Sequence, residues 1–281
     1  MKVAKLQYGD RTASAVIDGE TARIVSEWST GPVTSIPFDA PCLAVSDLKH
    51  RAEEAKQSLS LGDVRLVPPS GPLTKLICLG LNYKNHVDET HNDLPPNPTL
   101  FTKFPDALVG HRESLLCPRI SETFDFEGEI AVVIGKPGRH IHPDDALEHV
   151  FGYTIMMDGS VREYQKHSPS AGKNFWRSGS LGPWIVTADE ISDPRSLRLE
   201  TRLNDQTVQS TTADMMLYDI PSVISYISRW TPLSSGDVIA TGTPGGVGAR
   251  RKPPLWMRAD DTIEVEVSSI GVLSNRVELE A

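Results

Sequence analysis

Long apolar runs and cysteine are scarce in this chain of 281 residues, and its 28 lysines and arginines are fewer than its 37 aspartates and glutamates. No apolar run approaches the ~18 residues that a transmembrane helix needs, and the stretch from Met1 to Tyr8 lacks the apolar region of a signal peptide. The three cysteines, Cys42, Cys78 and Cys117, are odd in number and far apart, which argues against a disulfide framework and against a zinc site. We therefore expect a cytoplasmic protein with reduced thiols that does not bind membranes.

The formal net charge of −9 argues against nucleic-acid binding, because proteins that bind nucleic acids are usually basic. An acidic protein can still bind an acidic small molecule where a metal ion, or local arginines and lysines, reverse the potential in a cleft. The hydrophobic content of 39% and the charged content of 23% are those of an ordinary globular protein. The length allows either one large domain or a large domain with a small one beside it.

The composition of the chain changes near residue 70. Before it, two short runs of strand-forming residues flank Asp18-Gly19, which is a strong hairpin signal, and residues 45–59 have the spacing of a weakly amphipathic helix. The proline-rich stretch Val67–Pro72 predicts a stiff connector. We therefore predict a small β-rich N-terminal domain at residues 1–66 and a larger domain at residues 73–281.

Apolar patterns predict the elements of the larger domain. Buried or alternating runs predict strands at residues 76–79, 125–135, 150–157, 197–203, 206–210 and 237–241, with further alternation over 261–279. Helical spacing predicts helices at residues 159–167 and 220–230.

Two glutamates lie at the start of the strand predicted for residues 125–135. Alternate side chains of a strand share a face, so Glu127 and Glu129 point the same way, while the other face is apolar. Two like charges beside a buried strand repel each other unless one is protonated or a cation lies between them. Carboxylates alone suit a hard cation such as Mg²⁺, Ca²⁺ or Mn²⁺. The alternative is a solvated strand face, on which neither glutamate needs a partner.

The segment after the strand at 150–157 adds further candidates. Asp158 ends that strand and is a third carboxylate on a rigid element, where metal ligands are best held. Arg162 and Gln165 are three residues apart in the next helix and face one side. Lys173 is either a solvated loop lysine or a group that binds an oxyanion.

His86 and Glu89 are also three residues apart, within hydrogen-bonding reach if residues 84–89 are helical. A glutamate that holds one ring nitrogen of a histidine makes the other nitrogen a better base, although an ordinary surface pair has the same spacing. The proline-rich stretch Asn92–Thr99 is long enough for a lid beside His86 and is equally consistent with a crossover loop. The loop at residues 242–248 exposes backbone N–H groups and the Thr243 hydroxyl to an anion.

Taken in order, these stretches resemble the fumarylacetoacetate hydrolase family from about Leu73 to the C-terminus. The motifs that carry the resemblance are Gly80-x-Asn82-Tyr83-x-x-His86-x-x-Glu89, Phe126-Glu127-Gly128-Glu129, Asp158-x-Ser160-x-Arg162-x-x-Gln165, Gly172-Lys173, Leu181-Gly182-Pro183-Trp184 and Thr241-Gly242-Thr243-Pro244-x-Gly246-Val247-Gly248. The resemblance implies an α+β, β-rich fold, a mixed β-sandwich roll with flanking helices, and a homodimer.

The resemblance also implies roles for individual residues. Glu127, Glu129 and Asp158 would bind one divalent ion, commonly Mg²⁺, with Mn²⁺ or Ca²⁺ as alternatives. His86 and Glu89 would activate water, and Lys173 would stabilise developing negative charge. The residues that would hold the oxygens of the substrate are Arg162, Gln165 and Thr243.

These roles predict a metal-dependent hydrolase that cleaves a C–C bond in a 2,4-diketo acid of the acylpyruvate type, since a bound ion stabilises an enolate leaving group. The alternative is a decarboxylase, or an isomerase or hydratase, of an oxaloacetate-like or hydroxymuconate-like keto acid in aromatic or sugar-acid catabolism. A non-catalytic metal-binding scaffold or ligand sensor is a third hypothesis.

Some positions depart from the family pattern: Met157, Glu163, Trp176 and Arg177. We expect Trp176 and Arg177 to reshape the substrate pocket, where an extra arginine would favour a dicarboxylate or a sugar-acid derivative.

Overall fold

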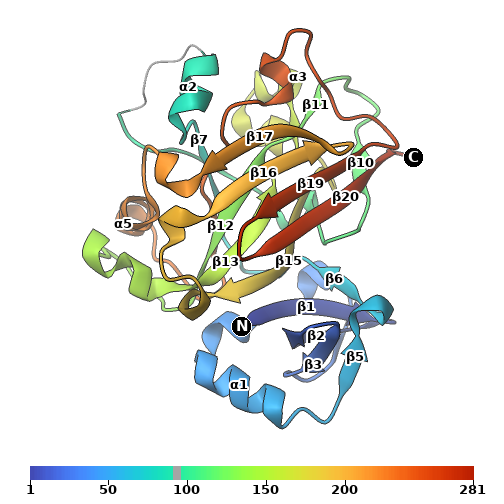
Figure 1. The fold of residues 1–281 in the computed structure, drawn as a ribbon, viewed down its shortest axis with the longest axis vertical. Helices are drawn as coiled ribbons and strands as arrows, with labels where there is room; N and C mark the ends of the chain where they lie inside the picture. The colour runs from blue at the N-terminus through green and yellow to red at the C-terminus, as the bar shows by residue number, and fades with distance from the viewer. Residues whose placement is uncertain (91–95) are drawn as a thin grey trace.

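The computed structural model describes residues 1–90 and 96–281, apart from the side chains of residues 88 and 90 (Figure 1). Within these residues the largest sheet has 13 strands. They are β1 (Lys2–Tyr8), β2 (Arg11–Asp18), β3 (Thr21–Ile24), β4 (Ser29–Thr30), β5 (Ser58–Ser60), β6 (Arg65–Val67), β7 (Leu76–Gly80), β8 (Thr99–Thr102), β9 (Leu108–Val109), β12 (Gly128–Ile134), β13 (Val150–Met157), β15 (Gly179–Thr187) and β18 (Val238–Ala240). The order along the main path is β5-β3-β2-β1-β15-β13-β12-β18-β7-β8.

A second sheet of five strands faces the centre of the large one. Its strands, in spatial order, are β10 (Leu115–Cys117), β20 (Gly271–Leu279), β19 (Thr262–Val267), β16 (Arg198–Leu203) and β17 (Gln206–Thr212). In Figure 1 these strands lie across β12, β13 and β15. Strand β16 contacts β12, β19 contacts β13, and β20 contacts β15. Apolar side chains of both sheets, such as Val132 and Val265, form the core between them. The arrangement is the predicted α+β, β-rich sandwich.

Five short α-helices flank the sheets in the described part of the chain: α1 (Val45–Glu53), α2 (Lys84–Thr90), α3 (Arg162–Gln165), α4 (Pro169–Lys173) and α5 (Ile220–Trp230). A small ladder of β11 (Phe124–Asp125) and β14 (Ser160–Val161) lies beside α3. None of the described helices has the length and hydropathy required to span a bilayer.

The N-terminal strands gather at one end of the molecule in Figure 1. They nevertheless continue the large sheet, because β1 pairs antiparallel with β15 through Lys2↔Val186 and Val3↔Ile185. The two parts of the chain thus share backbone hydrogen bonds. The division into domains at residues 1–66 and 73–281 stays a prediction.

Strand β12, which carries Glu129, is fully enclosed. All seven of its residues are buried. Ile130 and Val132 pack into the core between the sheets, and Ala131 and Val133 pack into a second core cluster on the other face. A solvated strand face is therefore wrong. Glu127 lies in the two-residue break between β11 and β12, so the predicted strand at 125–135 is interrupted there.

Several other predicted elements match the structure, including the strand at 150–157, the helix at 220–230 and the hairpin at Asp18-Gly19. The helix predicted for residues 45–59 is wrong after Glu53, because residues 58–60 instead pair with β3. The helix predicted for 159–167 covers only Arg162–Gln165, because Ser160 and Val161 pair with β11.

Candidate active site

Three carboxylates converge at the ends of β12 and β13. Glu129 is the second residue of β12, Glu127 immediately precedes that strand, and Asp158 immediately follows β13. Antiparallel pairing of the two strands brings these positions together, and the Asp158 N–H donates to the Glu127 carbonyl at 2.8 Å. One carboxylate oxygen from each residue lies within 4.8 Å of the others. The structure thus joins the three predicted metal ligands.

Glu129 is the carboxylate of the three whose negative charge has no ion pair within the described residues. It is fully buried; its Oε2 accepts a hydrogen bond from the Gly242 N–H at 2.9 Å, whereas Oε1 has no partner. Burial raises the pKa of Glu129 well above its ordinary range, and the negative charges of Asp158 and Glu127 raise it further. An unpartnered buried oxygen among three carboxylates fits a hard divalent cation, because such ions take oxygen ligands. The residues present therefore fit the expected metal ion.

Lys173, at the end of α4, supplies positive charge to the same cluster. Its Nζ lies 2.6 Å from Glu127 Oε2 and 2.8 Å from Asp158 Oδ2, and the side chain is buried. Burial lowers the pKa of Lys173, but Asp158 and Glu127 outweigh burial and raise it above its usual value. For Glu127, burial acts in the opposite sense, and Lys173 and Arg162 outweigh it to bring the pKa to about 2. A solvated loop lysine is therefore wrong at this position.

Arg162 and Gln165 of α3 lie beside Glu127. The guanidinium of Arg162 places Nη2 2.7 Å from Glu127 Oε1 and donates from Nε to Asp125 Oδ2 at 2.7 Å. Its Nη1 donates to Gln165 Oε1 at 2.9 Å. The guanidinium thus donates two hydrogen bonds within the protein and forms an ion pair with Glu127 through Nη2. The predicted pair is together, with Arg162 bound to carboxylates of the chain itself.

The His86–Glu89 pair forms within α2. His86 Nδ1 lies 2.8 Å from Glu89 Oε1, and Glu89 Oε2 accepts a hydrogen bond from the Gly246 N–H at 2.8 Å. The imidazole is only 9% exposed, so an ordinary surface pair does not describe it. Residues 92–95 of the predicted lid at 92–99 lie outside the described residues, and Thr99 begins β8.

The loop at residues 242–248 binds anions, but they are the protein's own carboxylates. Three of its N–H groups donate to carboxylates: Gly242 to Glu129 (2.9 Å), Gly246 to Glu89 (2.8 Å) and Gly248 to Asp125 (2.8 Å). The Thr243 hydroxyl donates to the Gly128 carbonyl at 3.0 Å and accepts from Gln209 Nε2 at 2.8 Å. The loop was predicted to offer these groups to an external anion; instead it orients the side chains of the site.

Two functional neighbours were missed by sequence reasoning. Asp125 orients Arg162 and is itself held by the N–H groups of Gly248 and Ala249, at 2.8 and 2.9 Å. Its place two residues before Glu127 was the available signal. Lys103, just after β8, lies fully buried with Nζ 2.7 Å from Asp158 Oδ1. No motif in the sequence pointed to Lys103, because its partner lies 55 residues further along the chain.

A cavity of about 610 Å³ lies beside the carboxylate cluster. The predicted site residues that line it are His86, Glu127, Arg162, Gln165, Lys173 and Thr243. Towards solvent, the exposed side chains of Lys166 and Arg250 complete the wall. The cavity is large enough for a small organic acid and brings a histidine, a buried ammonium and a carboxylate cluster together.

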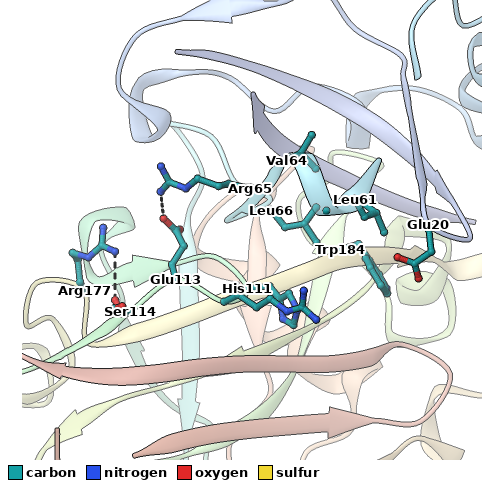
Figure 2. A pocket seen from close by; sticks show the side chains of 12 residues that line it. Glu20, Leu61, Val64, Arg65, Leu66, His111, Glu113, Ser114, Arg177 and Trp184 are labelled. Atoms are coloured by element: carbon teal, nitrogen blue, oxygen red, sulfur yellow. Dashed lines mark hydrogen bonds and ion pairs between the residues drawn. The ribbon is translucent and has the colours of Figure 1, made fainter. Parts of the chain in front are cut away.

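Arg177 lies elsewhere, so its predicted role in reshaping this pocket is wrong. Figure 2 shows Arg177 beside Ser114 in a different cavity of about 550 Å³, between the N-terminal strands and the larger part of the chain. Trp176 is 61% exposed and is not among the residues that line the 610 Å³ cavity. The left-handed backbone of Arg177, with φ of +51°, accompanies the turn that leads its side chain to the second cavity.

The profile of the family described as fumarylacetoacetate (FAA) hydrolase C-terminal matches residues 75–278. The chain belongs to the fumarylacetoacetate hydrolase family. The match covers all six predicted catalytic and metal-binding residues, from His86 to Lys173. The protein is therefore a member of a superfamily of enzymes.

Two of the curated relatives are named oxaloacetate tautomerases. An oxaloacetate tautomerase of Bacillus subtilis is 40% identical over 224 residues, which cover 78% of this chain and 74% of that protein. A mitochondrial oxaloacetate tautomerase of Xenopus laevis is 37% identical over 238 residues, covering 83% of this chain and 75% of that protein.

Solved structures of similar fold carry more than one name. A 5-carboxymethyl-2-hydroxymuconate delta-isomerase from Mycobacterium smegmatis aligns with a TM-score of 0.79 at 29% identity, over the whole of both chains. A fumarylacetoacetate hydrolase from Exiguobacterium antarcticum aligns with a TM-score of 0.84 at 33% identity, again over both whole chains. The names of the curated relatives and of the Mycobacterium smegmatis isomerase favour the isomerase alternative over the hydrolase that we expected first.

Proposed function

We propose that this protein is a divalent-metal-dependent tautomerase of an oxaloacetate-like 2-keto dicarboxylic acid. In the reaction a C–H bond beside the keto group breaks, an O–H bond forms on the keto oxygen, and the double bond moves from C=O to C=C. The observation that carries the proposal is the buried carboxylate cluster, with one unpartnered oxygen, beside a cavity that contains His86. The names of the curated relatives support the same reaction.

The three carboxylates are the residues that would hold the ion. Glu127, Glu129 and Asp158 offer only oxygen ligands, which suits Mg²⁺ as the first choice and Mn²⁺ or Ca²⁺ as alternatives. When bound, such an ion polarises a keto oxygen and stabilises the negative charge of an enolate.

His86 is the proposed base. It is the single histidine among the described residues that line the cavity, and Glu89 fixes the ring through Nδ1. The second ring nitrogen, Nε2, can then accept the proton from carbon and return it to oxygen. Glu89 in turn is fixed by the Gly246 N–H, so the base and its partner are both held before substrate binds.

The groups around the cluster are proposed to bind the keto-acid end of the substrate. Lys173 is the buried cation nearest the ligands and would stabilise the developing enolate charge. Arg162 has further N–H groups besides those that face Asp125, Glu127 and Gln165, and together with Gln165 it lines the cavity. Thr243 makes two hydrogen bonds within the protein, so we propose that it acts on substrate mainly by fixing the backbone of Gly128.

The outer wall suits a second carboxylate. Lys166 and Arg250 are both exposed at the solvent side of the cavity. A dicarboxylic acid that places its keto-acid end at the carboxylate cluster can direct its other carboxylate towards these cations. This favours a substrate of the oxaloacetate type over a keto acid with one carboxylate.

The test is an assay of enol–keto tautomerisation, followed by the ultraviolet absorbance of the enol of oxaloacetate. We expect the Mg²⁺-loaded protein to accelerate the conversion and EDTA to abolish the acceleration, with recovery when Mg²⁺ is restored. A matched variant at the other cavity, Arg65→Gln, should behave as the unaltered protein does. The absence of any acceleration with Mg²⁺, Mn²⁺ or Ca²⁺ would reject the proposal.

Hydrolysis of an acylpyruvate is the second candidate, and the His86–Glu89 pair favours it, because the same base can activate water. Release of pyruvate from an acylpyruvate would identify this activity. If pyruvate is released and oxaloacetate is not tautomerised, hydrolysis replaces tautomerisation as the function.

Two further expectations remain proposals. The three cysteines are unpaired, which supports a reducing compartment such as the cytoplasm. The homodimer implied by the resemblance is to be tested by light scattering.

A further inference from the structure

Lys103 is a second buried ammonium behind the carboxylate cluster. Its side chain has no exposed surface, and Nζ lies 2.7 Å from Asp158 Oδ1. The same ammonium donates to the carbonyl of Gly159 at 3.4 Å and to the carbonyl of Lys173. Because Lys173 Nζ bonds to the other oxygen of Asp158 at 2.8 Å, this one carboxylate lies between two lysines.

The contacts join seven charged groups into one buried network. Its carboxylates are Asp125, Glu127, Glu129 and Asp158, and its cations are Lys103, Arg162 and Lys173. With every group ionised the network carries one net negative charge, and with a divalent ion it carries one net positive charge. A positive centre attracts the anionic end of a 2-keto acid, and within a buried site this attraction is weakly screened.

Removing Lys103 makes the charge of the network more negative by one unit. The network would then carry two negative charges without an ion and none with a divalent ion. Lys173 contacts Glu127 and lines the cavity. Lys103 contacts Asp158 but is not among the residues that line the cavity. Lys103 therefore acts through the ligand cluster, not by touching substrate.

We propose that Lys103 is a positioning residue that sets the charge of the metal centre, weakening its hold on the ion and strengthening its hold on an anionic ligand. The inference rests on the proposed metal centre but not on which reaction the centre catalyses. A residue that merely kept Asp158 in place would act differently, because its loss would weaken both kinds of binding.

The experiment measures both affinities by calorimetry in the full-length protein. EDTA-treated wild type and Lys103→Met are titrated with Mn²⁺, and each is then titrated with oxalate at saturating Mn²⁺. We expect Lys103→Met to bind Mn²⁺ about tenfold more tightly and oxalate about tenfold more weakly, because one unit charge has been removed beside Asp158. The variant Lys103→Arg keeps the charge, so it should bind Mn²⁺ no more tightly and oxalate no more weakly than wild type does.

Other outcomes would overturn the proposal. If Lys103→Met weakens both Mn²⁺ and oxalate, or changes neither, the lysine does not set the charge of the centre. Lys103→Gln, which is uncharged but still donates hydrogen bonds, carries the same test if the Met variant fails to fold, as judged by circular dichroism. If neither uncharged variant folds, Lys103 is a determinant of folding and the proposal is rejected. If wild type fails to bind Mn²⁺, the metal centre fails with it, whereas a failed oxaloacetate assay leaves these binding results intact.

Discussion

The two cavities of this protein contain similar residue types in opposite settings. The 550 Å³ cavity in Figure 2 has arginines, glutamates and a histidine, and its ion pair joins Arg65 and Glu113. The Arg65 side chain there is 61% exposed, although its partner Glu113 is only 11% exposed. The 610 Å³ cavity also has arginine, lysine, glutamate and histidine, but Lys173 and Asp158 are 2% and 0% exposed.

The difference teaches that burial, more than composition, marks the functional site. An exposed ion pair contributes about 0–1 kcal/mol, because water solvates each partner almost as well. Removing one partner of a buried pair costs about 3–5 kcal/mol, because the other charge is left without compensation. Four carboxylates buried beside three cations are retained at considerable cost in desolvation, which is typical of a functional site.

The largest expected effect on ion binding is its loss in Glu129→Gln. The amide keeps the shape of the side chain and an oxygen for the Gly242 N–H, but it removes one negative charge from the cluster. We expect the Mn²⁺ affinity measured by calorimetry to fall at least about 100-fold, equivalent to about 3 kcal/mol. The thermal stability of the ion-free protein should be equal or higher, since a repulsive charge is gone.

The matched control lies in the other cavity. Glu113→Gln also removes one carboxylate, and it should leave the Mn²⁺ affinity unchanged. Equal Mn²⁺ affinities in Glu129→Gln and wild type would show that Glu129 is not a metal ligand, and the proposed difference between the two cavities would then fail.

The next effect is on the rate, and it compares the two histidines. His86→Gln should lower kcat for the proposed tautomerisation by about 10²–10⁴-fold, because the base is lost, without altering Mn²⁺ affinity. His111→Asn changes the histidine of the other cavity and should leave kcat unchanged. A full rate in His86→Gln would mean that another group removes the proton.

The smallest effect is on stability below neutral pH. Burial lowers the pKa of His111 to about 4, and the positive charge of Arg112 acts in the same direction. Its Nδ1 also accepts a hydrogen bond from the Ser274 N–H at 3.2 Å, which needs the unprotonated nitrogen. Between pH 6.5 and 4 the unfolded chain therefore binds a proton at this residue that the folded protein does not, so stability falls as the pH falls through that window.

Replacing His111 by Asn keeps an acceptor but removes the titration. We expect the melting temperature of His111→Asn to decline less between pH 6.5 and 4 than that of wild type, by an amount equivalent to about 1 kcal/mol, since the ring is only half-buried. Parallel declines in the two proteins would show that His111 titrates normally.

Local pattern predicted much of this fold, and it failed where partners are distant in sequence. The strand at 150–157 and the helix at 220–230 were predictable because each buries a regular apolar pattern. The helix predicted for 45–59 was too long, because pairing of residues 58–60 with β3 is a tertiary effect. Convergence of the three carboxylates required the pairing of β12 with β13, which the spacing of the residues did not reveal.

The site itself divides in the same way. Glu127, Glu129 and the His86–Glu89 pair could be proposed from short spacings, and the family resemblance supplied Lys173. Lys103 could not, because a lone lysine after a short strand has no local feature that distinguishes it from a surface residue. Arg177 was misplaced for a related reason: its neighbours in sequence are near the site, but its side chain turns into the other cavity.

The most direct test of the account is the location of an ion in a crystal soaked with Mn²⁺. The account predicts an anomalous density peak between Glu127, Glu129 and Asp158, with the unpartnered Oε1 of Glu129 among its ligands. A fully occupied Mn²⁺ at any other position, with the three carboxylates keeping only the protein contacts described above, would contradict it.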